Sequence, residues 1–193
     1  MRHALTLLTA LIALTSCSDG DPSNEPDALN LPLTSAAESS PELNDRGNMP
    51  KYIGEEAHVL ASTAADAAWV LTFNIDEIRV DPACDSGFPE PPANGHYIAI
   101  SVRVATTPDY DPDTQYLGFT ENDFRVIQPD GITVSDVTGK ARSCLDPSHS
   151  IASAQIGPGQ QYAGTVVIDA PVSTGALVYA PGGAPAGWEW DFF

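Results

Sequence analysis

Cations are scarce in this sequence. Its 193 residues include 8 Lys and Arg against 26 Asp and Glu, for a formal net charge of −18. Because a surface of this sign repels phosphate groups, the composition argues against nucleic acid as a partner. It argues equally against attachment to anionic lipid through a basic patch. Any membrane association must therefore depend on something other than surface charge.

The short motifs of common catalytic and metal sites are also missing. The sequence contains no CxxC, no HExxH, no Gly-x-Ser-x-Gly elbow and no glycine-rich phosphate loop that opens a helix. Asp146, His149 and Ser150 lie close together along the chain, so a hydrolase triad can be imagined from them. Closeness in sequence is not triad geometry. We therefore expect a protein that is not an enzyme.

Long apolar runs are missing after the first residues. Ala4 to Leu14 is apolar apart from threonines, too short to span a bilayer but typical of the core of a signal peptide. Leu14-Thr15-Ser16-Cys17 follows and resembles a bacterial lipobox, where a peptidase cuts before the cysteine and the thiol receives a diacylglycerol. We predict a signal peptide over 1–16 and a lipid on Cys17 that anchors the protein outside the cell membrane. The alternative is ordinary secretion with a cysteine there by chance.

Residues 17–61 are rich in Ser, Pro, Asp, Glu and Asn and show no sustained apolar periodicity. Such a segment buries too little apolar surface to offset its ordering entropy, which predicts a disordered, lipid-anchored tether. Alternatively, part of it folds on a partner, with Leu29, Leu31 and Leu33 as anchors. The alanine-rich stretch from Glu56 to Ala68 predicts a short helix.

From Trp69 onward the apolar residues recur with a period of two, which indicates strands. Past Asp76-Glu77 the phase shifts by one residue, as it does at a β-bulge. Further strands are expected over residues 96–105, 124–134, 162–168, 177–179 and 188–192. The segment 124–134 is expected to be a hairpin with Pro129-Asp130-Gly131 at its turn. Because no helices alternate with these strands, residues 62–193 are expected to form an all-β, antiparallel two-sheet sandwich.

Cysteines are few. Cys17 is assigned to the lipid, which leaves Cys84 and Cys144 in loops rich in Pro, Asp and Ser. An even pair in an exported protein predicts a disulfide. A redox or metal site is the alternative, but the neighbouring residues supply no further Cys or His ligands.

Several strand and turn segments resemble an uncharacterised immunoglobulin-like lipoprotein family of Gram-positive bacteria, related in fold to a secreted mycobacterial immunoprotective antigen. They are His96 to Val104, Phe124 to Ile132, Ile156 to Gln160 followed by Gly164 to Pro171, and Trp188-Glu189-Trp190. One departure is Thr106-Thr107-Pro108, where the family often has an Asn. The resemblance implies an immunoglobulin-like β-sandwich that serves as an extracytoplasmic interaction or accessory domain. It supplies no catalytic residues.

Asp109, Asp111 and Asp113 form the densest acidic spacing in the chain. Alternating acids can place several carboxylates around one Ca²⁺ ion, so a small-ligand or calcium-binding lipoprotein is the alternative function. Thr114 replaces the glycine that a calcium loop has after its third acid, which favours a solvated acidic loop. No other cofactor is indicated.

The aromatic residues Tyr179, Trp188 and Trp190 admit two interpretations, a binding platform for sugars or peptides and a part of the core. We favour the core, since Glu189 and Asp191 alternate with the tryptophans and are expected on the solvent face. The sequence therefore predicts a tethered sandwich domain that binds an envelope or extracellular protein, and it names no residue of the binding surface.

Overall fold

The computed structural model describes residues 42–62, 64, 66–115 and 117–193. The signal peptide, Cys17 and the first part of the tether lie outside the described residues. Where the chain is described, no helix is long and apolar enough to cross a membrane.

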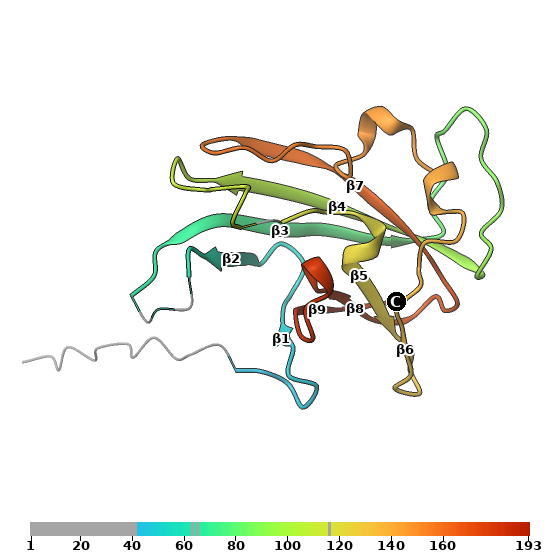
Figure 1. Ribbon diagram of the computed structural model, residues 1–193. Coiled ribbons are helices and arrows are strands. Elements are labelled where there is room, and N and C mark those ends of the chain that lie inside the picture. Colours follow the sequence, from blue (N-terminus) through green and yellow to red (C-terminus); the bar gives the residue numbers. More distant parts are fainter. Residues whose placement is uncertain (1–41, 63, 65, 116) are drawn as a thin grey trace, which may run out of the picture. The chain divides into compact units, whose positions relative to one another are not determined.

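The described chain folds into two β-sheets that face each other (Figure 1). The first sheet has the order β2-β3-β4-β7 and the second the order β1-β9-β8-β5-β6. All paired strands are antiparallel except β1 and β9. The chain passes from one sheet to the other after β1, β4, β6 and β7, as it does repeatedly in immunoglobulin-like sandwiches. The predicted all-β, immunoglobulin-like sandwich is confirmed.

The strands are mostly short. They are β1 (Met49–Pro50), β2 (Glu56–Leu60), β3 (Trp69–Val80), β4 (His96–Thr106), β5 (Phe124–Ile127), β6 (Thr133–Val134), β7 (Gln161–Ala170), β8 (Gly175–Tyr179) and β9 (Trp188–Phe192). Helical structure in the described ranges consists of the 3₁₀ turns η1 (Glu121–Asp123), η2 (Ala141–Ser143), η3 (Pro147–His149) and η4 (Pro181–Gly183).

Two local predictions are confirmed in detail. The register between β3 and β4 shifts between Ile75 and Glu77, which is the expected bulge. Strands β5 and β6 pair as a hairpin, and the amide of Gly131 donates to the carbonyl oxygen of Gln128 at 2.8 Å. Gly131 has a φ of +88°, a conformation that favours glycine at this turn.

The domain begins earlier in the chain than the sequence indicated. Strand β1 pairs with β9, and β2 pairs with β3 over Glu56 to Leu60, although both lie within the range assigned to the tether. The helix predicted over 56–68 is wrong for the same reason, because β2 occupies its first residues. Ala57 is buried in the main core. The burial gained against β3 and the sandwich core outweighs the helical preference of an alanine-rich stretch.

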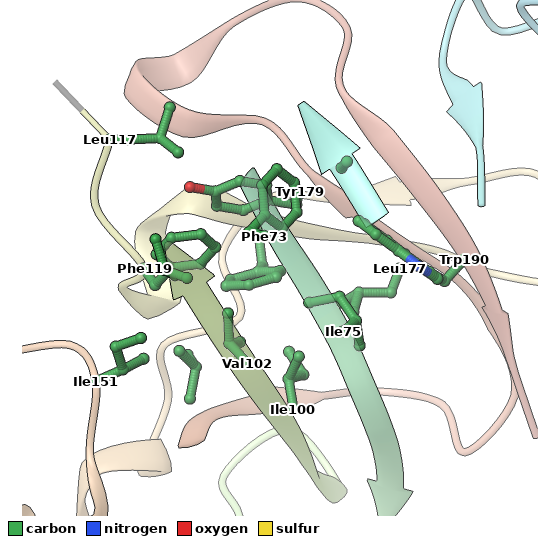
Figure 2. Close-up of a cluster of buried hydrophobic side chains, with 14 of the residues drawn as sticks. Phe73, Ile75, Ile100, Val102, Leu117, Phe119, Ile151, Leu177, Tyr179 and Trp190 are labelled. Carbon is green, nitrogen blue, oxygen red and sulfur yellow. The ribbon is translucent and has the colours of Figure 1, made fainter. Parts of the chain in front are cut away.

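The core fills the space between the sheets, with aromatic rings at one end (Figure 2). Phe73 on β3 meets the ring of Tyr179 on β8 with centroids 5.2 Å apart, and the ring of Trp188 on β9 at 5.0 Å. Tyr179 also stacks on Phe119 at 4.7 Å. Tyr179 and Trp190 are fully buried or nearly so, which places both in the core as favoured.

Glu189 departs from the expected pattern on β9. It lies opposite the tryptophans along the strand, yet it is buried, with 5% of its surface exposed. The segment before β1 covers it, and both Arg46 and Asn48 donate hydrogen bonds to its carboxylate. The prediction of a solvent-facing acid was therefore wrong at Glu189 and correct at Asp191, which is exposed.

Candidate interaction site at the disulfide-linked loops

Cys84 and Cys144 form a disulfide, as predicted. Their sulfur atoms are 2.02 Å apart, their Cα atoms are 4.5 Å apart, and 60 residues separate them in sequence. The bond joins the loop between β3 and β4, residues 81–95, to the segment of residues 139–150. We call these two segments the disulfide-linked loops.

The disulfide-linked loops build a second, small core on the outer face of the first sheet. Buried Cys144 and Ala141 pack there against Tyr97 and Ala99 from β4 and Val167 from β7. Because this cluster covers the sheet, the loops are held by burial of apolar surface as well as by the covalent link.

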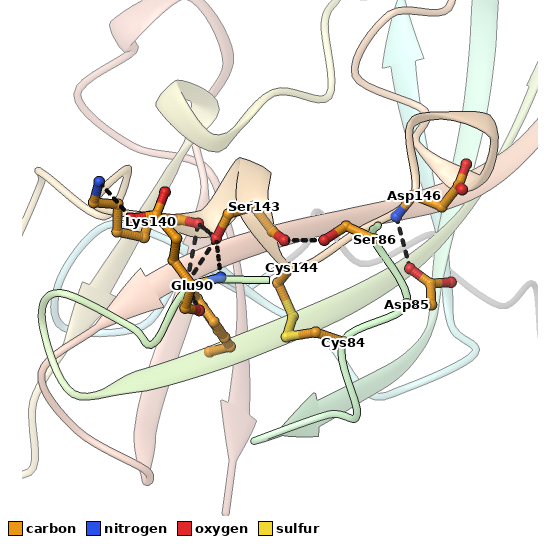
Figure 3. The surroundings of a disulfide bond; sticks show 9 residues. Cys84, Asp85, Ser86, Glu90, Lys140, Ser143, Cys144 and Asp146 are labelled. Atoms are coloured by element: carbon orange, nitrogen blue, oxygen red, sulfur yellow. Dashed lines mark hydrogen bonds and ion pairs between the residues drawn. A yellow bond between two sulfur atoms is a disulfide. The ribbon is translucent and has the colours of Figure 1, made fainter. Parts of the chain in front are cut away.

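Hydrogen bonds extend the contact on one side of the disulfide (Figure 3). The amides of Asp85 and Ser86 donate to the carbonyl oxygen of Cys144, at 2.9 and 3.3 Å. The amide of Asp146 donates to Oδ1 of Asp85 at 2.6 Å, and the hydroxyl of Ser86 donates to the carbonyl oxygen of Ser143. Each of residues 84–86 in the loop 81–95 is therefore held by the disulfide or by a hydrogen bond to the second loop.

A second group of contacts lies on the other side, at Glu90 (Figure 3). Its amide donates to Oγ of Ser143 at 3.2 Å, and its carboxylate lies 3.0 Å from Nζ of Lys140. The hydroxyl of Tyr97 reaches the carbonyl oxygens of Glu90 and Lys140 at 2.9 and 3.1 Å. The loop is thus held both before and after its tip.

Asp169 on β7 connects both loops to the sheet. Its side chain is fully buried, and its carboxylate accepts hydrogen bonds from the amides of Ala93, Asn94 and Lys140 at 2.7, 2.9 and 2.8 Å. Charge-assisted bonds of this kind are stronger than those between neutral groups. Gly139 lies so close to this carboxylate that a Cβ there would overlap with it, which requires glycine at the start of the second loop.

Asp169 was not predicted as a site residue, although an acid directly after the apolar run Val166-Val167-Ile168 is an informative pattern. A charged residue at a buried strand position is rare unless it is paired or hydrogen-bonded. Its partners come from two loops that are far away along the chain, and the sequence gives no indication of which they are.

Phe88 lies in the loop 81–95, between the disulfide and Glu90. Its side chain is 93% exposed. Three prolines, Pro89, Pro91 and Pro92, follow it and restrict the backbone. A large aromatic side chain in water on a braced loop is the type of residue that anchors protein interfaces.

Two histidines pair with aspartates at the edges of the loops. Nδ1 of His149 lies 2.7 Å from Oδ2 of Asp85, and Nδ1 of His96 lies 2.9 Å from Oδ2 of Asp81. The amide of Asp146 and the ring of His149 together hold the pKa of Asp85 below its usual range. These pairs link the first loop to η3 and to β4.

The three residues imagined as a triad are not arranged as one. The carboxylate of Asp146 accepts bonds from Ser148, whose amide lies 2.8 Å from it, and not from His149. Oγ of Ser150 accepts a bond from the amide of Ala152 at 3.1 Å. The described contacts therefore assign these side chains to turns in the second loop.

The acidic loop shows similar local bonding. The carboxylate of Asp111 accepts from the amide of Asp113 at 3.0 Å and from the hydroxyl of Thr114 at 2.9 Å. Asp109 and Asp113 are exposed. The part of the chain that the structure describes holds no group of three His, Cys, Asp or Glu side chains able to bind a metal ion. Nothing in this geometry favours calcium binding over a solvated turn.

The comparisons with known proteins concern the fold. No family model matches the chain, and no curated protein matches it. A search of solved structures finds MPT63, a secreted protein from Mycobacterium tuberculosis, with 16% sequence identity and a TM-score of 0.46. The match covers 75% of this chain and 97% of that chain.

Proposed function

We propose that this protein is an extracytoplasmic lipoprotein whose immunoglobulin-like domain binds an envelope or extracellular protein, without catalysing a reaction. The observation that carries the proposal is Phe88, which is held out into solvent by a loop that is fixed on both sides. A lipid on Cys17 would keep this loop close to the outer face of the membrane.

Export is supported by two independent features. The apolar run from Ala4 to Leu14 followed by Cys17 is typical of an export signal. The disulfide between Cys84 and Cys144 is the state expected of cysteines in an oxidising compartment. Stable anchoring needs more than one acyl chain, which the diacylglycerol of a lipobox cysteine provides. The acidic surface contributes no attraction to anionic lipid.

Binding through the loop 81–95 has a physical rationale. Association costs free energy whenever a loop must be ordered, and here the disulfide, Asp169 and Glu90 have already ordered it. Burial of one aromatic side chain in a partner's pocket supplies much of the affinity of a typical interface. A membrane tether raises the effective concentration of the loop near other envelope proteins.

The test is crosslinking in intact cells followed by mass spectrometry of the captured proteins, for the wild type and for Phe88→Ala. Ile132→Ala is the matched control, because Ile132 is also apolar and 57% exposed, but lies in the β5–β6 hairpin. The proposal predicts one recurring partner that Phe88→Ala loses and Ile132→Ala retains. Equal capture by all three forms, or no recurring partner, would contradict it.

The anchor is tested separately by Cys17→Ala. We expect this variant to leave the membrane fraction, while the wild type remains there. If the variant stays with the membrane, the lipid anchor is wrong, and the interaction through Phe88 has to be judged without it.

A further inference from the structure

A hollow of about 320 Å³ lies beside β7 and is formed in part by the second disulfide-linked loop, residues 139–150, while Phe88 is not among its lining residues. Its lining comes from η1, η2, η3, the segment after η3 and β7. The volume is at the lower end of the range for small-ligand sites. Most of the wall is apolar, with Leu145, Pro147, Ala152 and Val167 contributing.

A buried carboxylate holds a guanidinium group at one side of the hollow. Glu121 has a side chain that is 6% exposed and accepts a hydrogen bond from Nε of Arg142. The Arg142 side chain itself is 80% exposed, and among the described residues its two terminal nitrogens have no partner. Those nitrogens present a planar pair of donors, the geometry that matches a carboxylate.

Two hydroxyl groups on the lining have defined roles. Thr120 uses its proton to donate to Oδ2 of Asp123 at 2.7 Å, so toward a ligand its hydroxyl oxygen can act only as an acceptor. Oγ of Ser150 accepts from the amide of Ala152, so its own proton remains available for a ligand oxygen. An occupant that matches these groups needs an anionic oxygen pair, an N–H donor and a small apolar group.

We propose that this hollow binds the C-terminal end of a peptide whose last residue is small, branched and apolar. The terminal carboxylate pairs with Arg142 and Ser150, the side chain lies against Leu145 and Val167, and a peptide N–H donates to Thr120. This inference does not rest on the interaction proposed for Phe88.

The long-range field of the protein does not assist this binding, because the net charge of −18 repels an anion. Recognition must come from the short-range ion pair and from burial of the apolar side chain. Replacing the terminal carboxylate of the peptide by an amide removes its charge and keeps its shape. This replacement therefore tests the ion pair with Arg142 directly.

The test is a titration followed by NMR, which reports on the amides of Ala152 and Val167. The probes are N-acetyl-alanyl-valine, its C-terminal amide, and isovalerate. Isovalerate has the branched apolar group of valine and the carboxylate but no peptide N–H. We expect the acid peptide to bind at least about tenfold more tightly than the amide, the loss that follows from one charge-assisted bond. Isovalerate should bind more weakly than the acid peptide.

Two variants locate the binding. Arg142→Gln should reduce affinity for the acid peptide about tenfold or more, whereas Arg79→Gln, another exposed arginine paired with a glutamate, should not change it. Because Arg142→Gln leaves Glu121 buried without its partner, Ala152→Phe provides a second test that fills the hollow and keeps the ion pair. Equal binding of acid and amide, equal binding of isovalerate, or full affinity in Ala152→Phe would each overturn the proposal.

Discussion

Arg46 and Glu189 form a two-pronged ion pair across 143 residues of sequence. Nε of Arg46 lies 3.1 Å from Oε2 of Glu189, and Nη2 contacts Oε1. Asn48 adds a bond to Oε2 at 2.8 Å. These contacts attach the segment before β1 to β9, the strand with which β1 itself pairs.

Arg46→Ala is expected to lower the free energy of unfolding by about 1–2 kcal/mol, since it leaves a buried carboxylate with one fewer charged donor. The matched control is Arg79→Ala, whose pair with Glu77 is exposed on both sides and should contribute less than about 0.5 kcal/mol. Urea unfolding of the two variants measures the difference. Equal losses would show that the Arg46–Glu189 pair is no more important than a surface ion pair.

Glu189 also predicts the direction of the pH dependence. Burial opposes ionisation of its carboxyl, but the bonds from Arg46 and Asn48 outweigh burial and hold its pKa below the ordinary value of 4.5. The unfolded chain therefore binds the proton more readily, and stability is lost as pH falls below about 4.5 toward the lower folded pKa. Glu189→Gln should flatten this part of the stability curve. An unchanged slope in that variant would mean that other carboxyls carry the acid sensitivity.

The local features of the fold were readable because they are encoded over a few residues. The bulge near Asp76 appears as a phase shift, and the turn at Gly131 as a turn tripeptide. Strands β1 and β2 were missed, because their signal is weak and their pairing partners are distant. The burial of Glu189 depends in the same way on Arg46, which sequence periodicity cannot reveal.

The candidate site was predictable only in part. The two cysteines were paired correctly, because an even pair in a protein predicted to be exported favours a disulfide over a redox or metal site. Phe88 carries no sequence signal of its own, because an aromatic residue is more often buried than presented. The loop that carries it is held by contacts of Asp169 and Glu90, which join segments far apart along the chain.

Asp169→Asn should destabilise the disulfide-linked loops. An asparagine offers one acceptor oxygen where the carboxylate serves three amides, so at least one buried N–H loses its partner, at a cost of about 1–3 kcal/mol. Amide hydrogen exchange at Ala93, Asn94 and Lys140 should accelerate. Asp130→Asn is the control, because an asparagine at that exposed turn keeps the bond to Ile132. Unchanged exchange in Asp169→Asn would contradict the bracing role.

Removing the disulfide is expected to cost about 2–5 kcal/mol of folding free energy. The variant that carries both Cys84→Ala and Cys144→Ala avoids mispairing. Urea unfolding gives the cost, and mass analysis of the exported wild type without reducing agent should show no free thiol at these two positions. Two free thiols, or a stability equal to the wild type, would argue against the link as a structural brace.

Calcium should leave thermal unfolding unchanged. Asp111 directs its carboxylate oxygens to its own turn, and Asp109 and Asp113 are exposed. Melting curves in excess calcium and in excess chelator should therefore coincide. A calcium-dependent rise in melting temperature that Asp111→Asn abolishes would revive the calcium-binding function.

The proposed contact between Phe88 on its braced loop and a partner protein can be detected by photo-crosslinking from that position. A photoreactive amino acid would replace Phe88 in one strain and Ile132 in another, with the anchored protein irradiated in intact cells. We expect a discrete, reproducible adduct from position 88 and none of the same mass from position 132. The same adduct from both positions, or none from position 88, would contradict it.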